Sequence, residues 1–385
     1  MLKKIKKILI CLFNIFPIDK KLIVFESNVD LSDSTYALYL YLKKYYLNYK
    51  LVWAVSKNNI KSVKQLNVKC FSYDNKIITL YYLTKAKFFF YTHRALIDRK
   101  LKKNQYAYNI WHGSPCKKFN GSLIDNTYNN HCFVTQTKFT YEQYFKNYNI
   151  SKINYLLINH LRNDFFEKNF DIETWRRANE LLNIDSYKYN IVWMPTFRRD
   201  KANSDNFFDN FSINFLKEDF DEINLFLKKN NAQLIIKMHP MAVNSCNNIE
   251  RDFSNISIYS SQELSSKKIN IYSILGQSSA LISDFSSVVF DYLLLNRPIG
   301  YVICDLEYYL QNKNEGFIYK NIENFFAGPI IADKKDLLIF FQSIFNKKDL
   351  YYEKRIDLNE KFNNEQIPGN ICENFCSLIK LNKKD

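Results

Sequence analysis

Two of the five histidines stand at positions where a proton acceptor would be useful. His112 follows the apolar run 106–110 and His239 follows 233–238, so each comes just after a predicted buried strand and close to a proline. A histidine with an unperturbed pKa near ~6.5 can act as a general base at neutral pH. A single histidine is more often structural. The parallel placement of these two in separate halves of the chain favours a catalytic role for at least one of them.

The stretch 281–298 combines an apolar start with a polar cluster and then a helical pattern. Its polar residues include Ser283, Asp284, Ser286 and Ser287, and the apolar residues after them recur at helical spacing. Ser283 and Asp284 favour the N-cap position, which predicts a helix that begins near them. The free N–H groups and the positive dipole end of such a helix attract phosphate. An ordinary capped helix in an α/β sheet explains the same pattern, and both interpretations stay open on this stretch alone.

The chain carries no glycine-rich phosphate loop, because neither a GxGxxG nor a GxxxxGK[ST] pattern occurs. A phosphate would have to be bound by hydroxyls, helix N–H groups and cations. Arg198 and Lys237 are candidate cations, since arginine grips phosphate with two parallel hydrogen bonds and lysine acts as a point charge. Metal ligation is not expected, because the histidines lack HExxH or HxxxH spacing and no DxD pair follows a predicted strand.

The elements that would position these residues alternate between short apolar strands and helices. Strands are predicted at 21–25, 51–55, 68–71, 88–91, 106–110, 131–134, 154–158, 191–194, 233–238, 256–259, 280–283 and 299–303. Helices are predicted at 35–46, 172–182, 215–227, 335–345 and 370–381. This alternation is typical of parallel α/β sheets, whose ligands bind outside the carboxyl ends of the strands. The more polar stretch 162–187 is interpreted as the connection between two such series.

Length and composition indicate two domains and an anionic partner. A chain of 385 residues exceeds one ordinary domain, and 47% hydrophobic residues suffice for two cores. The net charge of +15 suits phosphate-rich substrates, anionic lipid head groups or nucleic acid. The basic residues are scattered in small clusters, which argues against a nucleic-acid track. The eight cysteines form no CxxC pair and no secretory signal is visible, which predicts reduced thiols in a cytosolic protein.

The N-terminal residues 1–20 are basic and apolar. Their apolar run, 8–16, is shorter than the ~20 residues that a membrane-spanning helix needs, and it lacks the cleavage site of a signal peptide. Lysines around a short apolar helix would suit the surface of an anionic membrane. A basic first helix packed on its own domain explains the segment equally well.

Several short motifs occur in an order and spacing that are specific when taken together. They are Phe25-Glu26-Ser27 with Ser32-Asp33-Ser34; Trp111-His112-Gly113-Ser114-Pro115 with Lys117-Lys118; Arg162-Asn163-Asp164; Pro195-Thr196-Phe197-Arg198; Lys237-Met238-His239-Pro240; Ser283-Asp284-Phe285-Ser286-Ser287 with Asp291; and Arg297-Pro298. This combination resembles the CDP-glycerol glycerophosphotransferase family, which builds teichoic acids and related poly(alditol phosphate) chains. The sequence departs from the family pattern at Asn159-His160-Leu161, where Gly-x-Pro is usual.

The resemblance implies an α/β fold of the GT-B type, in which two Rossmann-like domains face each other across a cleft. The expected parts are the basic apolar segment 1–20, an acceptor domain at 21–165, a CDP-donor domain at 166–368 and a C-terminal helix at 369–385 that packs back on the N-terminal domain.

The resemblance also implies roles for individual residues. His112 and His239 correspond to the essential histidines of the family. Donor and phosphate binding is expected at Arg198, Thr196, Ser283, Asp284, Ser286, Ser287 and Asp291. Contact with the acceptor or the cleft is expected at Glu26, Asp33, Gly113 and Lys117. Glu26 and Asp33 would serve equally well as caps of the following helix, and Asp291, further along its helix, would serve as a structural residue.

The implied reaction is attack by an acceptor hydroxyl on the β-phosphorus of CDP-glycerol, with release of CMP. His112 would take the hydroxyl proton, and His239 would help to hold the diphosphate. No cofactor or metal is expected beside the donor substrate. The expected partners are a CDP-alditol, a lipid-linked or polyol-phosphate acceptor and an anionic membrane surface, with no nucleic acid. The expected place is the cytoplasmic face of the cell membrane, in teichoic-acid or capsule synthesis.

Three alternatives stay open. The first is a transferase that uses CDP-ribitol, and the second is a GT-B glycosyltransferase that uses a nucleotide sugar. The third is a non-catalytic protein that binds membrane or nucleic acid, against which the polar strand ends argue.

Overall fold

The computed structural model describes most of the chain. The described residues are 15–92, 101–118, 131–148, 154–195, 217–238, 253–284, 286–303, 306–307 and 316–383. Three predicted site residues, Thr196, Arg198 and His239, lie outside these ranges, as do residues 1–14 of the basic N-terminal segment.

The chain forms two compact units. Unit 1 comprises Met1–Gly113, Phe119–Asp164 and Asn370–Asp385, and unit 2 comprises Ser114–Lys118 and Phe165–Gly369. The short segment Ser114–Lys118 was expected in the N-terminal domain, whereas here it groups with unit 2. Its backbone explains this placement, because Lys118 N donates to Gly316 O at 2.9 Å and Ile318 N donates to Cys116 O at 2.9 Å.

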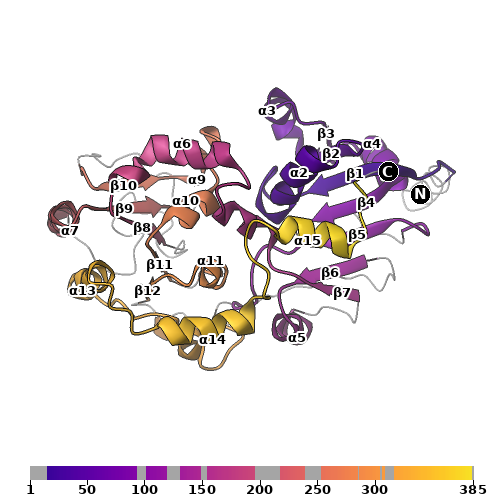
Figure 1. Ribbon diagram of the computed structural model, residues 1–385. Coiled ribbons are helices and arrows are strands. Elements are labelled where there is room, and N and C mark those ends of the chain that lie inside the picture. The colour runs from indigo at the N-terminus through magenta and orange to yellow at the C-terminus, as the bar shows by residue number, and fades with distance from the viewer. Residues whose placement is uncertain are drawn as a thin grey trace. The chain divides into compact units, whose positions relative to one another are not determined.

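Unit 1 is built on a parallel sheet (Figure 1). Its described strands are β1 (Asp19–Glu26), β2 (Lys50–Val55), β3 (Cys70–Ser72), β4 (Ala86–Tyr91), β5 (Tyr106–Asn109), β6 (His131–Thr135) and β7 (Asn154–Leu157). They lie in the order β3-β2-β1-β4-β5-β6-β7, which is the Rossmann order with one further strand. The apolar runs of β1 and β4 are buried, as expected for a parallel sheet that is covered on both faces.

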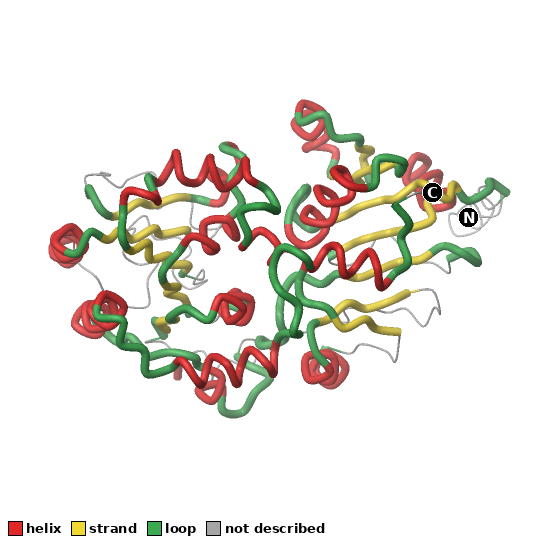
Figure 2. The backbone as a smooth tube through the Cα atoms, viewed as in Figure 1, coloured by secondary structure: helices red, strands yellow, loops and turns green. Residues whose placement is uncertain are grey.

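Helices border the strands of unit 1 (Figure 2). They are α2 (Asp33–Tyr45), α3 (Ile60–Gln65), α4 (Lys76–Lys85), α5 (Lys138–Asn147), α15 (Ile371–Leu378) and the short 3-10 helices η1 (Lys57–Asn59) and η2 (Leu161–Phe166), of which η2 runs across the boundary between the units. α15 lies along β4 and β5, where the ring of Phe375 packs 5.8 Å from Phe90 and 5.7 Å from Tyr108. The C-terminal helix is thus an integral part of unit 1.

Unit 2 contains a second parallel sheet with a similar strand order. Its described strands are β8 (Tyr189–Met194), β9 (Ala232–Lys237), β10 (Ile256–Tyr259), β11 (Ala280–Ser283) and β12 (Ile299–Tyr301). They lie in the order β10-β9-β8-β11-β12. A core of buried side chains that includes Ile191, Trp193, Leu234, Ile236 and Ile282 fixes this sheet against its helices.

The described helices of unit 2 include three, α9, α10 and α14, that the sequence pattern did not predict. They are α6 (Ile172–Leu182), α7 (Lys217–Lys229), α9 (Ser261–Ser266), α10 (Ile271–Gln277), α11 (Val288–Tyr292), α13 (Lys334–Phe345), α14 (Tyr352–Phe362) and the 3-10 helices η3 (Ile184–Ser186), η7 (Leu293–Leu295) and η8 (Ile322–Phe325). α14 was missed because charged residues dominate it, and only Arg355, Leu358 and Phe362 of its side chains are buried.

The strand order marks where each sheet can bind a ligand. In unit 2 the order reverses between β8 and β11, so the residues that follow Met194 and Ser283 lie at the switch point. In unit 1 it reverses between β1 and β4, and β5, which leads to His112, is the next strand. Ligands of open parallel sheets bind outside the carboxyl ends of the strands at such points. Among the described polar residues singled out in the sequence, Glu26 and Ser283 end strands β1 and β11, and His112 and Asp284 follow strand ends.

Candidate active site

His112 lies just after β5, in a backbone segment whose carbonyl groups are hydrogen-bonded. Arg162 Nη1 donates to His112 O at 2.5 Å, and the buried hydroxyl of Tyr144 on α5 donates to Gly113 O. As a residue His112 is partly exposed, and its imidazole packs against Trp111, with 3.9 Å between ring centroids. The backbone around His112 is thus held by side chains of α5 and η2. Gly113, another predicted site residue, contributes its carbonyl to this arrangement.

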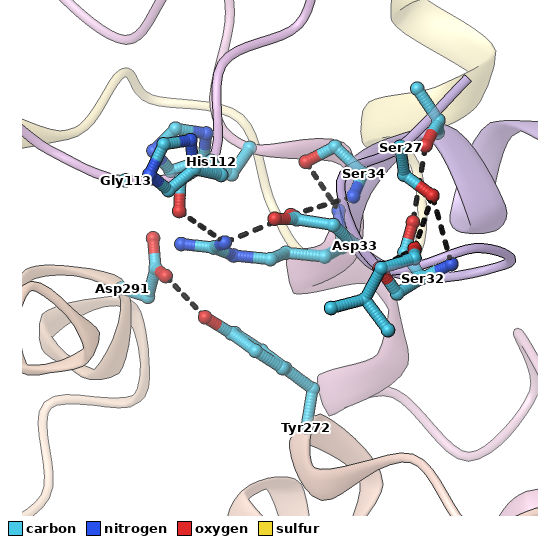
Figure 3. Close-up of polar contacts among 12 residues, drawn as sticks. Ser27, Ser32, Asp33, Ser34, His112, Gly113, Tyr272 and Asp291 are labelled. Atoms are coloured by element: carbon cyan, nitrogen blue, oxygen red, sulfur yellow. Dashed lines mark hydrogen bonds and ion pairs between the residues drawn. The ribbon is translucent and has the colours of Figure 1, made fainter. Parts of the chain in front are cut away.

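Asp33 lies at the start of α2 and contacts the same arginine (Figure 3). Its Oδ1 accepts hydrogen bonds from Ser34 N at 2.7 Å and from Arg162 Nη1 at 2.8 Å. Ser32 is the N-cap residue of α2 and makes no side-chain cap hydrogen bond. Asp33 therefore does not cap the helix in the usual way but forms a largely buried ion pair with Arg162.

Glu26, the other acidic candidate of unit 1, is the last residue of β1 and is partly buried. Burial, and then the charge of Glu26, raise the pKa of the Tyr91 hydroxyl at the end of β4. Glu26 and Tyr91 are paired in register across the two central strands. Glu26 is thus placed at the switch point of unit 1, where a carboxylate could meet a ligand.

Ser283 and Asp284 lie at the corresponding point of unit 2. Both side chains are buried, and Ser283 Oγ donates to Met194 O at 3.0 Å, which ties the end of β11 to the end of β8. The expectation that one of them caps a helix is wrong, because α11 begins only at Val288 and Ser287 is its N-cap. The Ser283 hydroxyl joins two strands instead, and the chain needs further residues to turn from the sheet into the helix.

Ser286 and Ser287 are the partly exposed hydroxyls of this turn. Ser286 Oγ accepts a hydrogen bond from Val288 N at 3.4 Å. Ser286 and Asp284 also line a small cavity whose other walls are mainly aromatic and aliphatic, among them Phe290 and Phe317. The cavity volume is about 10 Å³, enough for about one water.

Asp291 lies inside unit 2, on the buried side of α11. Its exposed fraction is 0%, and the hydroxyl of Tyr272 on α10 donates to its Oδ2 at 2.5 Å, as Figure 3 also shows. This contact links α10 to α11 and favours the structural reading of Asp291 over direct contact with a phosphate.

Lys237 ends β9, and its amine is removed from solvent. Burial lowers the pKa of Lys237 to about 8, so a fraction of the amine is neutral near physiological pH. Such a lysine gains affinity for a proton when an anion binds beside it.

Lys117, a predicted site residue, belongs to the segment that unit 2 holds. It forms an isolated antiparallel bridge with Phe317, and Tyr319 donates its hydroxyl hydrogen to Pro115 O at 2.8 Å. Cys116, its neighbour, lines the small cavity, and burial raises the pKa of its thiol to about 12. That thiol is therefore protonated and unreactive at neutral pH.

Comparison with known proteins identifies the family. The model of the CDP-glycerol:poly(glycerophosphate) glycerophosphotransferase family matches residues 8–381. The chain belongs to this family. It is accordingly an enzyme of the glycerophosphotransferase type.

Individual members of the family match most of the chain. A teichoic acid glycerol-phosphate transferase of Staphylococcus aureus is 26% identical over 387 residues, which cover 94% of this chain and 93% of the relative. A teichoic acid poly(glycerol phosphate) polymerase of Bacillus spizizenii is 27% identical over 374 residues, with 88% and 87% covered. The solved structure of the wall teichoic acid polymerase TagF is 21% identical, covers 100% of this chain and 97% of its own, and superposes with a TM-score of 0.75. The fold is therefore of the GT-B type, with two Rossmann-like α/β units.

Two contributors to the site carry no obvious sequence signal. Arg162 lies in a family motif, but nothing in the motif tells that its side chain binds the His112 carbonyl. Tyr144 is one of 28 tyrosines, and its helix gives no hint that its hydroxyl reaches Gly113. Long-range hydrogen bonds of this kind join residues that no local pattern relates.

Neither a membrane-spanning helix nor a metal-binding cluster occurs among the described residues. No described helix is long and apolar enough to cross a bilayer. Nor do the described His, Cys, Asp and Glu side chains form a group of three or more that could hold a metal ion.

Proposed function

We propose that this enzyme transfers glycerol phosphate from CDP-glycerol to a hydroxyl of a lipid-linked or poly(glycerol phosphate) acceptor, with release of CMP. The family match over residues 8–381 carries this conclusion. The two teichoic acid enzymes that match nearly the full chain support the choice of glycerol phosphate and of a polymeric or lipid-linked acceptor.

In the proposed step, His112 acts as the general base. It takes the proton of the acceptor hydroxyl while that oxygen forms a bond to the β-phosphorus of CDP-glycerol. The bond between the β-phosphorus and the bridging oxygen breaks, and its electron pair leaves with CMP. Phosphoryl-type transfer depends mainly on positioning and on charge stabilisation, which suits a histidine whose backbone is held by two neighbours.

The donor diphosphate is proposed to bind at the switch point of unit 2. Ser286 and Ser287 offer partly exposed hydroxyls there, and Lys237 offers a cation at the end of β9. His239, Arg198 and Thr196 join this group by their place in the family motifs. Together these groups would neutralise the charge that develops on the departing CMP.

A surface of unit 1 supports docking at the cytoplasmic face of an anionic membrane. On α4 the side chains of Ile77, Ile78 and Tyr81 are exposed, and Lys76 and Lys85 flank them. Phe16, the second residue of the described chain, packs edge-on against Tyr81 at 6.3 Å between ring centroids. Apolar side chains framed by lysines suit an interface of anionic lipid head groups, and the basic residues of 1–14 continue the chain from this point.

Purified enzyme with CDP-glycerol and a glycerol-phosphate-primed lipid acceptor tests the proposed reaction. We expect release of CMP and growth of the acceptor by glycerol phosphate units, and product length separates single addition from polymerisation. CDP-ribitol and UDP-sugars serve as competing donors. Faster release of CMP from CDP-ribitol than from CDP-glycerol would identify CDP-ribitol as the donor. A lack of CMP with both CDP-alditols would reject the proposed function.

Sedimentation with lipid vesicles tests the membrane surface. We expect binding to vesicles that contain anionic phospholipid and weak binding to neutral ones. Ile77→Glu and Tyr81→Glu should reduce binding, whereas Ile339→Glu, at an equally exposed apolar position on α13, should leave it unchanged. An equal loss of vesicle binding in all three variants would show that the membrane-binding surface is not specific to α4.

A further inference from the structure

We propose that Arg162, oriented by Asp33, is a positioning residue that sets the placement of His112. This role rests on the proposed function, because it presupposes that His112 is the base of the transfer. Arg162 contacts the backbone of His112 rather than any reacting atom, so it acts through the histidine.

The guanidinium of Arg162 joins two acceptors that come from different parts of unit 1. Its Nη1 lies 2.8 Å from Asp33 Oδ1 and 2.5 Å from His112 O. Only 8% of the Arg162 side chain and 17% of the Asp33 side chain are exposed. An arginine has several donors in a rigid plane and keeps its charge when buried, so it can bridge a carboxylate and a carbonyl in one geometry.

The loop before α2 aims the Asp33 carboxylate at this arginine. Asp33 has a φ of +62° and Leu31 a φ of +57°, which few non-glycine residues adopt. Serine hydroxyls hold the loop in this shape, since Ser27 Oγ and Ser32 Oγ each donate to Val29 O at 2.5 Å (Figure 3). The loop thus carries a backbone strain at the residue that makes the ion pair. Aspartate and asparagine tolerate this conformation better than most other residues.

A second contact completes the hold on the His112 backbone. Tyr144 donates to Gly113 O, so the carbonyls of two successive residues are both hydrogen-bonded by buried side chains. Rotation of this segment would break both bonds. The side chain of His112 projects from this segment, so the direction of its Cα–Cβ bond depends on these two hydrogen bonds. A displacement of a catalytic group by about 1 Å can lower the reaction rate by about 100-fold.

The contrasting explanation is that the ion pair only stabilises unit 1. The two explanations differ in what a variant changes. A purely stabilising pair alters the midpoint of unfolding but not kcat of the folded enzyme. A positioning pair alters kcat, and its charges alter the protonation of His112.

Four substitutions separate geometry from charge. Arg162→Lys keeps the charge but loses the planar bridge, and we expect kcat to fall about 10-fold at an unchanged pH profile. Arg162→Ala should lower kcat about 100-fold. It also leaves the negative Asp33 near His112, which favours the imidazolium. The pH below which kcat falls should therefore rise.

Asp33→Asn leaves the positive Arg162 without its counter-charge, which disfavours the imidazolium. The pH below which kcat falls should therefore decrease. Asp33→Gly keeps the backbone conformation but removes the acceptor, and should lower kcat like Arg162→Ala.

An NMR titration of the histidines in the absence of substrate measures the change in the His112 pKa independently of turnover. The chain has five histidines, and His112→Gln identifies the His112 signal. We expect the His112 pKa to rise in Arg162→Ala and to fall in Asp33→Asn. The matched control is Arg176→Ala, which removes an exposed arginine that pairs with Glu173 and Glu180 on α6, and which should change neither readout.

The outcomes are distinguishable. If wild-type enzyme releases no CMP but the His112 titration shifts as stated, the proposed function fails and the positioning of His112 stands. If wild-type enzyme is active, and Arg162→Lys and Asp33→Asn retain full kcat with an unshifted His112 signal, Arg162 is not a positioning residue. Should Arg162→Ala fail to fold, these two milder variants decide alone.

Discussion

The polar edges of the two sheets hold similar residue types in different ways. In unit 1 the backbone around His112 is bound by Arg162 and Tyr144, and Asp33 is committed to an ion pair. In unit 2 Ser283 joins two strands, but Ser286 and Ser287 remain partly exposed on the turn before α11. A general base must be held in a fixed orientation toward its substrate. An anion-binding site instead needs hydrogen-bond donors that are exposed enough to reach the ligand. This difference supports the proposal that unit 1 supplies the base and unit 2 supplies the phosphate contacts.

Removal of the proposed base, His112, should produce the largest effect on catalysis. We expect His112→Gln to lower kcat by about 10²–10⁴-fold, because general base catalysis typically contributes that much. The KM for CDP-glycerol should change little, since the proposed donor contacts lie in unit 2. Steady-state CMP release measures both constants. A large rise in KM at constant kcat would show that His112 binds the donor, and the contrast between the units would then disappear.

Lys237 tests whether the burial of a charged amine in unit 2 lowers the stability of the folded protein. Its pKa of about 8 lies below the ordinary value of 10.5, so the unfolded chain binds the proton more tightly. Stability should therefore rise as pH increases from about 8 to about 10.5, by an amount on the order of 2 kcal/mol, less than the full shift because part of the residue stays exposed.

Urea unfolding of wild type and Lys237→Met at pH about 7 and about 10 measures this effect. We expect Lys237→Met to be more stable than wild type at the lower pH, and the difference to shrink at the higher pH. The same substitution should weaken CDP-glycerol binding if the amine contacts the diphosphate. A constant difference between the two proteins at all pH values would mean that the amine is not desolvated.

Asp164 tests how far buried hydrogen bonds stabilise unit 1. Its two carboxylate oxygens accept hydrogen bonds from Ile371 N at 2.9 Å and Cys372 N at 2.8 Å, and the residue is fully buried. Asp164→Ala should cost about 2 kcal/mol, because it leaves buried amides without an acceptor at the start of α15. Hydrogen exchange should rise first in Ile371–Leu378. Asp333→Ala, which removes an exposed cap of α13, should cost less, about 1 kcal/mol.

The hydroxyls of the α11 turn should give the smallest effect and sharpen the contrast most. Ser286→Ala and Ser287→Ala should each raise the KM for CDP-glycerol about 10-fold, the usual scale for a hydrogen bond to a charged group, with little change in kcat. Ser266→Ala, on the exposed surface of α9, is the matched control. If kcat fell in place of affinity, these hydroxyls would act on the transition state and not on donor binding.

Most of the fold could be predicted from local pattern. The apolar run 21–25 became β1, the helical pattern 172–182 became α6, and the order of strands and helices gave two parallel sheets. Buried strands of parallel sheets are apolar throughout, so they are visible in sequence. The start of α11 was predicted too early, because Ser283 is a good cap by type but its hydroxyl binds the carbonyl of a neighbouring strand. That competition between partners depends on the sheet, not on the stretch itself.

The sequence by itself determined the alternation of elements, the family and the residue types at the sheet edges. Only the tertiary structure decided which of those residues share a contact. Asp33 and Arg162 are 129 positions apart, Arg162 and His112 are 50 apart, and Asp164 and Ile371 are 207 apart. Local pattern reflects interactions within a few residues along the chain. Contacts across such separations arise only when strands and helices pack, because packing is what brings their ends to one edge.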